Sequence, residues 1–219
     1  MAIKEKGLGG YKPNTPWMYK HPNVWTWLAL EIGVKSVIDI GCAEGHVLKF
    51  FKFLGCKVHG VDGCKYAYNH NLVKENVALH DYRTGPYIPK DSYDLGWSHD
   101  FVEHVDEQYI PNYMDTFSKC SKYVCLSFAV KGCRGYHHVN TNDLPYWVDL
   151  FATRGFKPNN ELTEQAKRIS IDGGKLTPEI LAAFPEVERY KDLVGKRDAH
   201  IFSVTRRCNR QSGIVFERM

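Results

Sequence analysis

The sequence lacks the features that mark disulfide-stapled, secreted and membrane-embedded proteins. It holds seven cysteines, an odd number, and no two of them form a C-x-x-C pair, so we expect neither a disulfide framework nor a cysteine-rich zinc site. No stretch approaches the ~18 consecutive apolar residues of a membrane span. Residues 1–20 carry charges and prolines instead of an apolar signal segment. These absences predict a cytoplasmic protein with no membrane partner.

A strong excess of charge is also missing. The 219 residues carry a net charge of +4, whereas binding to nucleic acid usually needs a concentrated basic face. The one basic cluster, formed by Arg206, Arg207 and Arg210, is interpreted as solvated surface because short charge runs are usually surface features. A nucleic-acid partner is therefore not expected.

What the sequence does contain is the alternation of an α/β fold. Short apolar runs alternate with segments of helical periodicity, which is the pattern of a parallel sheet wrapped by crossover helices. Helices are predicted after Pro22, at 46–54, around 110–117 and around 144–151. Strands are predicted at 36–40, 57–61, 76–79, 93–97, 123–130 and 200–205, the last of which would complete the sheet.

The length suits a single domain over residues 1–219. Within it, residues 1–33 are predicted to form an N-terminal cap and residues 162–196 a variable insertion. Thr177 followed by Pro178 is a favourable N-cap and first-turn pair. The insertion is therefore predicted to be partly helical and to act as a lid, while the oligomeric state is left open.

The most informative segment joins the strand at 36–40 to the next helix. It reads D-x-G-C-x-x-G from Asp39 to Gly45, and its glycines let the backbone turn sharply and approach a ligand at the helix N-terminus. A dinucleotide loop would read G-x-G-x-x-G, and Asp39 would repel a pyrophosphate but accept hydrogen bonds from a cationic amino-acid group. Asp62 ends the next strand, where it can accept hydrogen bonds from both ribose hydroxyls. The alternative is a tight turn in another α/β protein.

On these residues, the stretch 34–158 resembles the class I S-adenosylmethionine-dependent methyltransferases. The resemblance implies a Rossmann-like, doubly wound sheet of seven strands, mostly parallel with an antiparallel late strand, and S-adenosylmethionine as the cofactor. It also implies that the glycine loop holds the methionine part, Asp62 the ribose and Asp81 the adenine amine. The implied cofactor-binding residues are Asp39, Gly41, Cys42, Glu44, Gly45, Asp62, Gly63, Asp81, Tyr82 and Ser98.

The residues after the fourth predicted strand are rich in proton-transfer groups. Ligands of open α/β sheets bind beyond the carboxyl ends of the strands, so Asp100 and His104 are candidate catalytic bases near the transferable methyl group. The segment also resembles the E-H-V segment of the ubiquinone-biosynthesis O-methyltransferases, whose acid-x-x-Glu-His cluster binds a divalent cation. Asp100, Glu103 and His104 match that spacing. Because the same dipeptide occurs in class I methyltransferases without metal, no metal is predicted, and helix-start or substrate-lining roles are preferred.

A second histidine cluster follows the fifth predicted strand. His137 and His138 are both candidate bases or substrate ligands, although a single histidine is more often structural. The stretch 137–156, from H-H-V-N through P-Y-W to G-F, resembles small methyltransferases found in phages and beside glycan-biosynthesis enzymes. That resemblance implies O-methylation of a hydroxyl group on a sugar or other small metabolite.

Several other functions compete with this one. A nucleic-acid amino-methyltransferase would carry Asp/Asn-Pro-Pro-Tyr/Phe where this chain reads Ser98-His99-Asp100. A cytosine methyltransferase would need a Pro-Cys nucleophile, and a protein-arginine methyltransferase a paired-glutamate loop; the sequence has neither. A catalytically silent scaffold that only binds the cofactor is the non-enzyme alternative, which the chemically competent histidines and acids disfavour.

Overall fold

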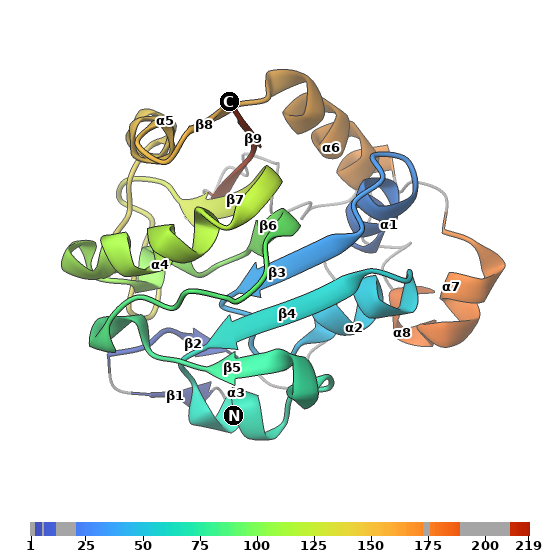
Figure 1. The fold of residues 1–219 in the computed structure, drawn as a ribbon, viewed down its shortest axis with the longest axis horizontal. Helices are drawn as coiled ribbons and strands as arrows, with labels where there is room; N and C mark the ends of the chain where they lie inside the picture. Colours follow the sequence, from blue (N-terminus) through green and yellow to red (C-terminus); the bar gives the residue numbers. More distant parts are fainter. Residues whose placement is uncertain (1–2, 6, 12–20, 173–175, 189–210) are drawn as a thin grey trace.

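The computed structural model describes residues 3–5, 7–11, 21–172, 176–188 and 211–219. Its centre is a seven-stranded sheet with the strand order β5-β4-β3-β6-β7-β9-β8 (Figure 1). The strands are β3 (Ser36–Ile40), β4 (Lys57–Asp62), β5 (Val77–Leu79), β6 (Tyr93–Ser98), β7 (Cys120–Ala129), β8 (Phe156–Pro158) and β9 (Gln211–Arg218). A separate two-stranded hairpin joins β1 (Ile3–Lys4) to β2 (Gly10–Tyr11).

The sheet is mostly parallel. Strands β5, β4, β3, β6 and β7 pair in parallel, and β9 runs antiparallel to both of its neighbours, β7 and β8. This arrangement confirms the predicted mixed sheet of seven strands with an antiparallel late strand. The late strand predicted at 200–205 lies outside the described residues, and the antiparallel strand of the structure is β9.

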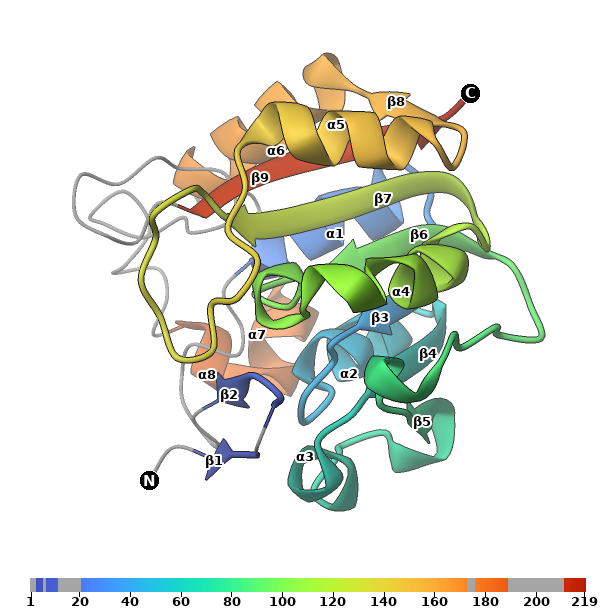
Figure 2. The same cartoon turned by 90° about the vertical axis from the view of Figure 1, so that its left-hand side faces the viewer.

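Two buried cores fill the two faces of the sheet. Along β3, Val37 belongs to one core and Ile38 to the other, because successive strand residues point to opposite faces. The first core packs against α1 (Pro22–Leu30), α2 (His46–Phe53) and α6 (Asn160–Asp172); the second packs against α4 (Ile110–Phe117) and α5 (Leu144–Ala152). Helices therefore cover both faces, as a doubly wound fold requires (Figures 1 and 2).

Most element boundaries agree with the sequence pattern. The strand at 36–40 has the predicted bounds, whereas the first helix ends at Leu30, before the predicted Ile32, and the chain turns at Gly33 with a φ of +78°. Strand β7 begins three residues earlier than predicted. The short strand β8 is not predicted, because three residues ending in a proline are too few to show a period of two.

The insertion is helical in its described part, as predicted. Thr177 caps α7 (Pro178–Ala183) by accepting a hydrogen bond from the Ile180 N–H at 3.3 Å. The Phe184 ring, between α7 and α8 (Pro185–Glu188), lies 4.9 Å from the Phe50 ring of α2. The lid expectation is not met by these residues, because they pack against the outer helix layer and none of them lines the cavity described below.

Shorter helical segments lie in the connections between the strands and before α4. They are α3 (Lys65–Asn69) and the 3-10 turns η2 (Lys74–Asn76), η3 (Tyr82–Thr84), η4 (Val102–His104) and η5 (Glu107–Tyr109). Among the described residues, no helix has both the length and the apolar composition needed to cross a bilayer. The six cysteines of the described part form no disulfide bond with one another.

Candidate functional site

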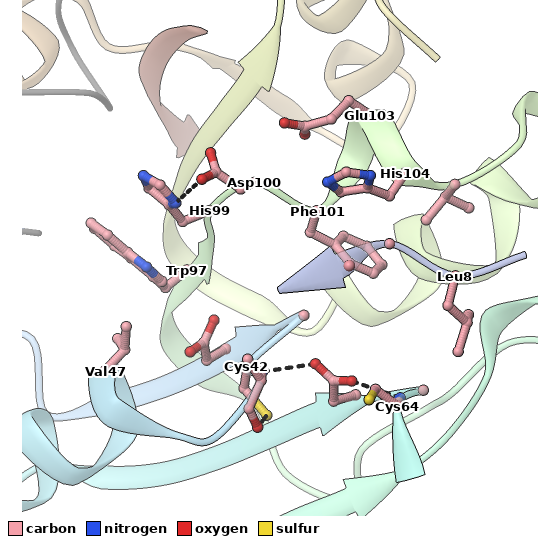
Figure 3. A pocket seen from close by; sticks show the side chains of 18 of the residues that line it. Leu8, Cys42, Val47, Cys64, Trp97, His99, Asp100, Phe101, Glu103 and His104 are labelled. Carbon is pink, nitrogen blue, oxygen red and sulfur yellow. Dashed lines mark hydrogen bonds and ion pairs between the residues drawn. The ribbon is translucent and has the colours of Figure 1, made fainter. Parts of the chain in front are cut away.

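A cavity of about 500 Å³ lies at the carboxyl ends of β3, β4 and β6 (Figure 3). Within the sheet, β4 lies next to β3 on one side and β6 lies next to β3 on the other. Such a reversal of the strand order opens a ligand crevice in doubly wound sheets. Figure 3 shows Cys42 and Cys64 on one wall and Asp100 and His104 on the opposite wall. The first wall of the cavity is built from the loops after β3 and β4, and the second wall from the segments after β6 and β7.

The loop after β3 adopts a conformation that requires glycine. Gly41 and Gly45 have φ values of +81° and +77°, which strain other L-residues. A Cβ added at Gly41 would lie 2.6 Å from the Phe101 ring. The Gly41 N–H donates to the Val61 carbonyl of β4 at 2.9 Å. This hydrogen bond attaches the loop to β4, and the Gly41 backbone lines the cavity.

Asp62 links the ends of β3 and β4. Its carboxylate accepts hydrogen bonds from the backbone N–H groups of Ala43 and Cys64, both at 2.7 Å. Burial raises the pKa of Asp62 above its usual value, and the two backbone hydrogen bonds oppose that shift. Because a carboxylate offers about four acceptor sites, Asp62 retains the capacity to accept hydrogen bonds from a ligand in the cavity.

Asp39 is a second carboxyl group at the same wall and is only 2% exposed. Burial, followed by the nearby Asp62 carboxylate, raises the pKa of Asp39 well above its usual range. Among the described residues that line the cavity, none is a lysine or an arginine. The cavity therefore favours a ligand with positive charge, which would stabilise ionised Asp39, and disfavours a pyrophosphate.

The opposite wall carries an Asp–His pair at its base. Asp100 has a φ of +53°, a left-handed conformation that is uncommon for residues other than glycine, and its N–H donates to the Ser127 hydroxyl at 2.9 Å. Its carboxylate lies 3.2 Å from Nδ1 of His99 (Figure 3). Both side chains line the cavity.

Two further histidines of this wall have their tautomers set by backbone carbonyls. The Nδ1 atoms of His104 and His138 lie 3.1 Å from the His137 carbonyl and 3.2 Å from the Cys133 carbonyl, respectively. A carbonyl can only accept, so each Nδ1 carries the proton when the ring is neutral and each Nε2 carries a lone pair. Burial, then the neighbouring His138, lowers the pKa of His104. The two rings lie 5.0 Å apart, centre to centre.

His137, in contrast, supports this wall with its backbone carbonyl and not with its side chain. It has a φ of +54°, and its carbonyl accepts hydrogen bonds from His104 and from the Val139 N–H. Its side chain does not line the cavity, whereas the His138 side chain does. Of the two histidines predicted from the sequence, the structure places one at the cavity and the other behind it.

The predicted cofactor residues are distributed unevenly around the cavity. Asp39, Gly41, Cys42, Asp62 and Gly63 line it, whereas Glu44, Gly45, Asp81, Tyr82 and Ser98 do not. Ser98 and Tyr82 make local contacts instead. The Ser98 hydroxyl donates to the Ile40 carbonyl at 2.9 Å, and the Tyr82 hydroxyl lies 3.0 Å from the Thr116 hydroxyl in the core.

Asp81 is engaged by its neighbour in the chain. The Arg83 guanidinium and backbone N–H donate to its carboxylate at 2.6 to 3.0 Å. Its backbone nevertheless runs beside the cavity, since a Cβ added at Gly63 would lie 3.5 Å from the Asp81 Cα. To contact a ligand, the Asp81 carboxylate would have to give up hydrogen bonds that it accepts from Arg83.

The N-terminal region is predicted from the sequence only as a cap at 1–33, and none of the individually predicted site residues belongs to it or to the aromatic residues of the cavity wall. Leu8, Gly9 and Gly10 line the cavity, together with His21, Trp25, Trp97, Phe101 and Tyr136. A Cβ added at Gly9 would lie 2.8 Å from the His104 ring, so this segment lies directly against the second wall. The glycines at positions 7, 9 and 10 are the one signal of such close approach in the sequence.

Solved structures with the same fold support this description. The magnesium protoporphyrin IX methyltransferase of Synechocystis PCC 6803, solved with bound SAM, has a TM-score of 0.59 and 14% identity over 93% of this chain and 80% of its own. The plantazolicin methyltransferase BpumL, solved in complex with SAH, has a TM-score of 0.53 and 12% identity over 94% and 85%. A SAM-dependent methyltransferase from Archaeoglobus fulgidus has a TM-score of 0.50 and 17% identity over 89% and 93%. At these identities the likeness concerns the fold.

The sequence itself matches a family. No curated protein matches the chain in a sequence comparison. A family model described as a methyltransferase domain, however, matches residues 24–169, which is more than half of the chain and includes the glycine loop, Asp62 and both histidine clusters. The chain therefore belongs to the methyltransferase domain family.

Proposed function

We propose that this protein binds S-adenosylmethionine in the cavity and transfers its methyl group to a hydroxyl group of a sugar or other small metabolite. The observation that carries the proposal is that two carboxyl groups, Asp39 and Asp62, line the cavity close to each other beside the glycine loop. The described wall of this cavity has no lysine or arginine. S-adenosylmethionine carries a sulfonium and an ammonium group, so its positive charge suits this wall. The similar structures solved with SAM or SAH support the same cofactor.

In this proposal each part of the cofactor has a partner on the first wall. The methionine part lies along Gly41 and Cys42, with its ammonium group directed toward Asp39, and the ribose hydroxyls donate to Asp62. Gly63 leaves space for the adenine, whose amine approaches Asp81 once that carboxylate turns from Arg83. Glu44, Gly45, Tyr82 and Ser98 would support this wall from behind.

The acceptor binds at the second wall. Methyl transfer from a sulfonium is an in-line displacement, so the main tasks are to align the acceptor oxygen and to remove its proton. As the oxygen–carbon bond forms and the carbon–sulfur bond breaks, the hydroxyl proton passes to a base. The Nε2 lone pair of His104 or His138 suits that role, and Asp100 is the carboxylate alternative on the same wall.

The test is isothermal titration of the purified protein with S-adenosylmethionine and, separately, with S-adenosylhomocysteine. Binding of both with one site per chain supports the cofactor assignment, and methyl-transfer assays with sugars, nucleotide sugars and other hydroxylated metabolites then test the acceptor. Failure to bind either ligand would refute the proposal. Transfer only to a nucleic acid or a protein would retain the cofactor and refute the acceptor class, and binding without transfer to any acceptor would indicate a scaffold.

A further inference from the structure

We propose that Glu103, His104 and His138 form a binding site for one divalent transition-metal ion. Glu103 and His104 lie on the turn η4, and His138 comes from the loop after β7. One ligand atom from each of the three side chains lies within 4.8 Å of the other two. All three residues line the cavity, and the Glu103 side chain is buried. Figure 3 shows Glu103 and His104 together on the wall that also carries Asp100.

The two histidines are oriented as metal ligands are. A metal-binding imidazole usually donates its other ring N–H to a carbonyl or carboxylate, which sets the tautomer and aims the lone pair. Here Nδ1 of His104 bonds to the His137 carbonyl at 3.1 Å and Nδ1 of His138 bonds to the Cys133 carbonyl at 3.2 Å. Both Nε2 atoms are therefore left as the ligand atoms.

The backbone joins the two segments that supply the ligands. The Glu103 carbonyl accepts hydrogen bonds from the N–H groups of Val139 and Asn140 at 2.9 and 3.1 Å, so the loop of His138 is attached to the ligand residue Glu103. The left-handed conformation of His137 places its carbonyl where His104 needs an acceptor. Atoms bound to one ion at 2.0–2.2 Å lie roughly 3–4 Å apart, which is somewhat closer than the 4.8 Å within which the three ligand atoms lie here.

The ligand chemistry selects the class of ion. Two imidazoles and one carboxylate suit zinc, iron(II), cobalt(II) or nickel(II), whereas magnesium and calcium prefer oxygen ligands. Three protein ligands leave at least one position for water or for an oxygen of a substrate. Given the proposed function, an ion at this wall would bind the acceptor hydroxyl and lower its pKa. The metal-bound Nε2 lone pairs could not also accept the proton, so the acidified hydroxyl would release it to the Asp100 carboxylate on the same wall or to water.

The experiment is a calorimetric titration of tag-free, chelator-treated protein with zinc chloride, and separately with magnesium chloride, without any methyl donor. We expect one zinc ion per chain and at least a hundredfold weaker binding of magnesium. Glu103→Gln and His138→Gln should each weaken zinc binding at least tenfold, because ligand loss costs no less than the ~10–100-fold known for supporting groups. His70→Ala is the matched control, since this exposed histidine lies outside the cavity.

Circular dichroism of each variant controls for folding, and X-ray absorption of the zinc-loaded protein should show two imidazole ligands. The proposal is overturned by absence of zinc binding in the folded protein, by zinc binding that both variants retain, or by equal affinity for magnesium. Titration of the same metal-free sample with S-adenosylmethionine separates the two proposals, because cofactor binding there would leave the proposed function intact when zinc fails to bind.

Discussion

The Asp62 carboxylate accepts a hydrogen bond from the backbone N–H of Ala43 at 2.7 Å, which joins the end of β4 to the glycine loop after β3. Ala43 itself has a φ of +45°, so the loop adopts an uncommon backbone conformation where Asp62 binds it. The acid proposed to bind the ribose thus also shapes the loop proposed to bind the methionine part. The first two predictions test the carboxyl groups of this wall.

Replacing Asp62 with Asn is expected to weaken S-adenosylmethionine binding by about 1–3 kcal/mol, because the amide loses the charged acceptor of two hydroxyl groups. Isothermal titration measures this change. Asp91→Asn is the control, since Asp91 is exposed and pairs with Lys57 away from the cavity. Unchanged affinity in the Asp62 variant would remove this residue from the site.

Replacing Asp39 with Asn is expected to stabilise the cofactor-free protein near neutral pH while weakening cofactor binding. Burial raises the pKa of Asp39, so ionised Asp39 opposes folding above that raised pKa, and the penalty disappears once the pH falls below its ordinary value. Each ~1 kcal/mol of relief raises the Tm by about 2–4 °C. Thermal melts at pH 4 and pH 7.5 should show a gain at the higher pH only; a lower Tm at pH 7.5 would contradict the electrostatic account.

Gly41→Ala and Gly33→Ala separate backbone strain from steric clash. Both glycines have φ near +80°, so both substitutions should cost roughly 1–2 kcal/mol of stability. A Cβ at Gly41 would also meet Phe101, whereas one at Gly33 would meet nothing within 4 Å. We expect urea denaturation to show the larger loss for Gly41→Ala, and only this variant should lose cofactor affinity. Equal losses in both variants would mean that the loop adapts to a side chain.

His138→Ala is expected to lower turnover about 10²-fold or more, the usual contribution of a general base or a comparable acidifying group, with cofactor affinity nearly intact. Measured kcat and the S-adenosylmethionine Kd test both parts. His70→Ala, at the exposed C-cap position of α3 and outside the cavity, should change neither. Equal loss of turnover and cofactor affinity would instead identify His138 as a structural residue.

The α/β fold and the first wall could be predicted from the sequence alone. The strand at 36–40, the glycines that follow it and the acid at the end of the next strand lie within 27 residues of one another. Local preferences favour their conformations, because glycine adopts positive φ at Gly41 and Gly45 without the strain of a side chain and strand alternation separates Val37 from Ile38. Such features depend on near neighbours in the chain, so their pattern is visible before folding.

What surrounds that wall depends on contacts that form only in the folded chain. The approach of Gly9 to His104, the grouping of His138 with Glu103, and the packing of the described residues 176–188 of the insertion against α2 all join segments far apart in the sequence. His137 and His138 are identical in type and adjacent in the chain, so no pattern distinguishes them. Their different roles arise because the left-handed backbone at His137 and the hydrogen bonds to the Glu103 carbonyl place one ring in the cavity and the other outside it.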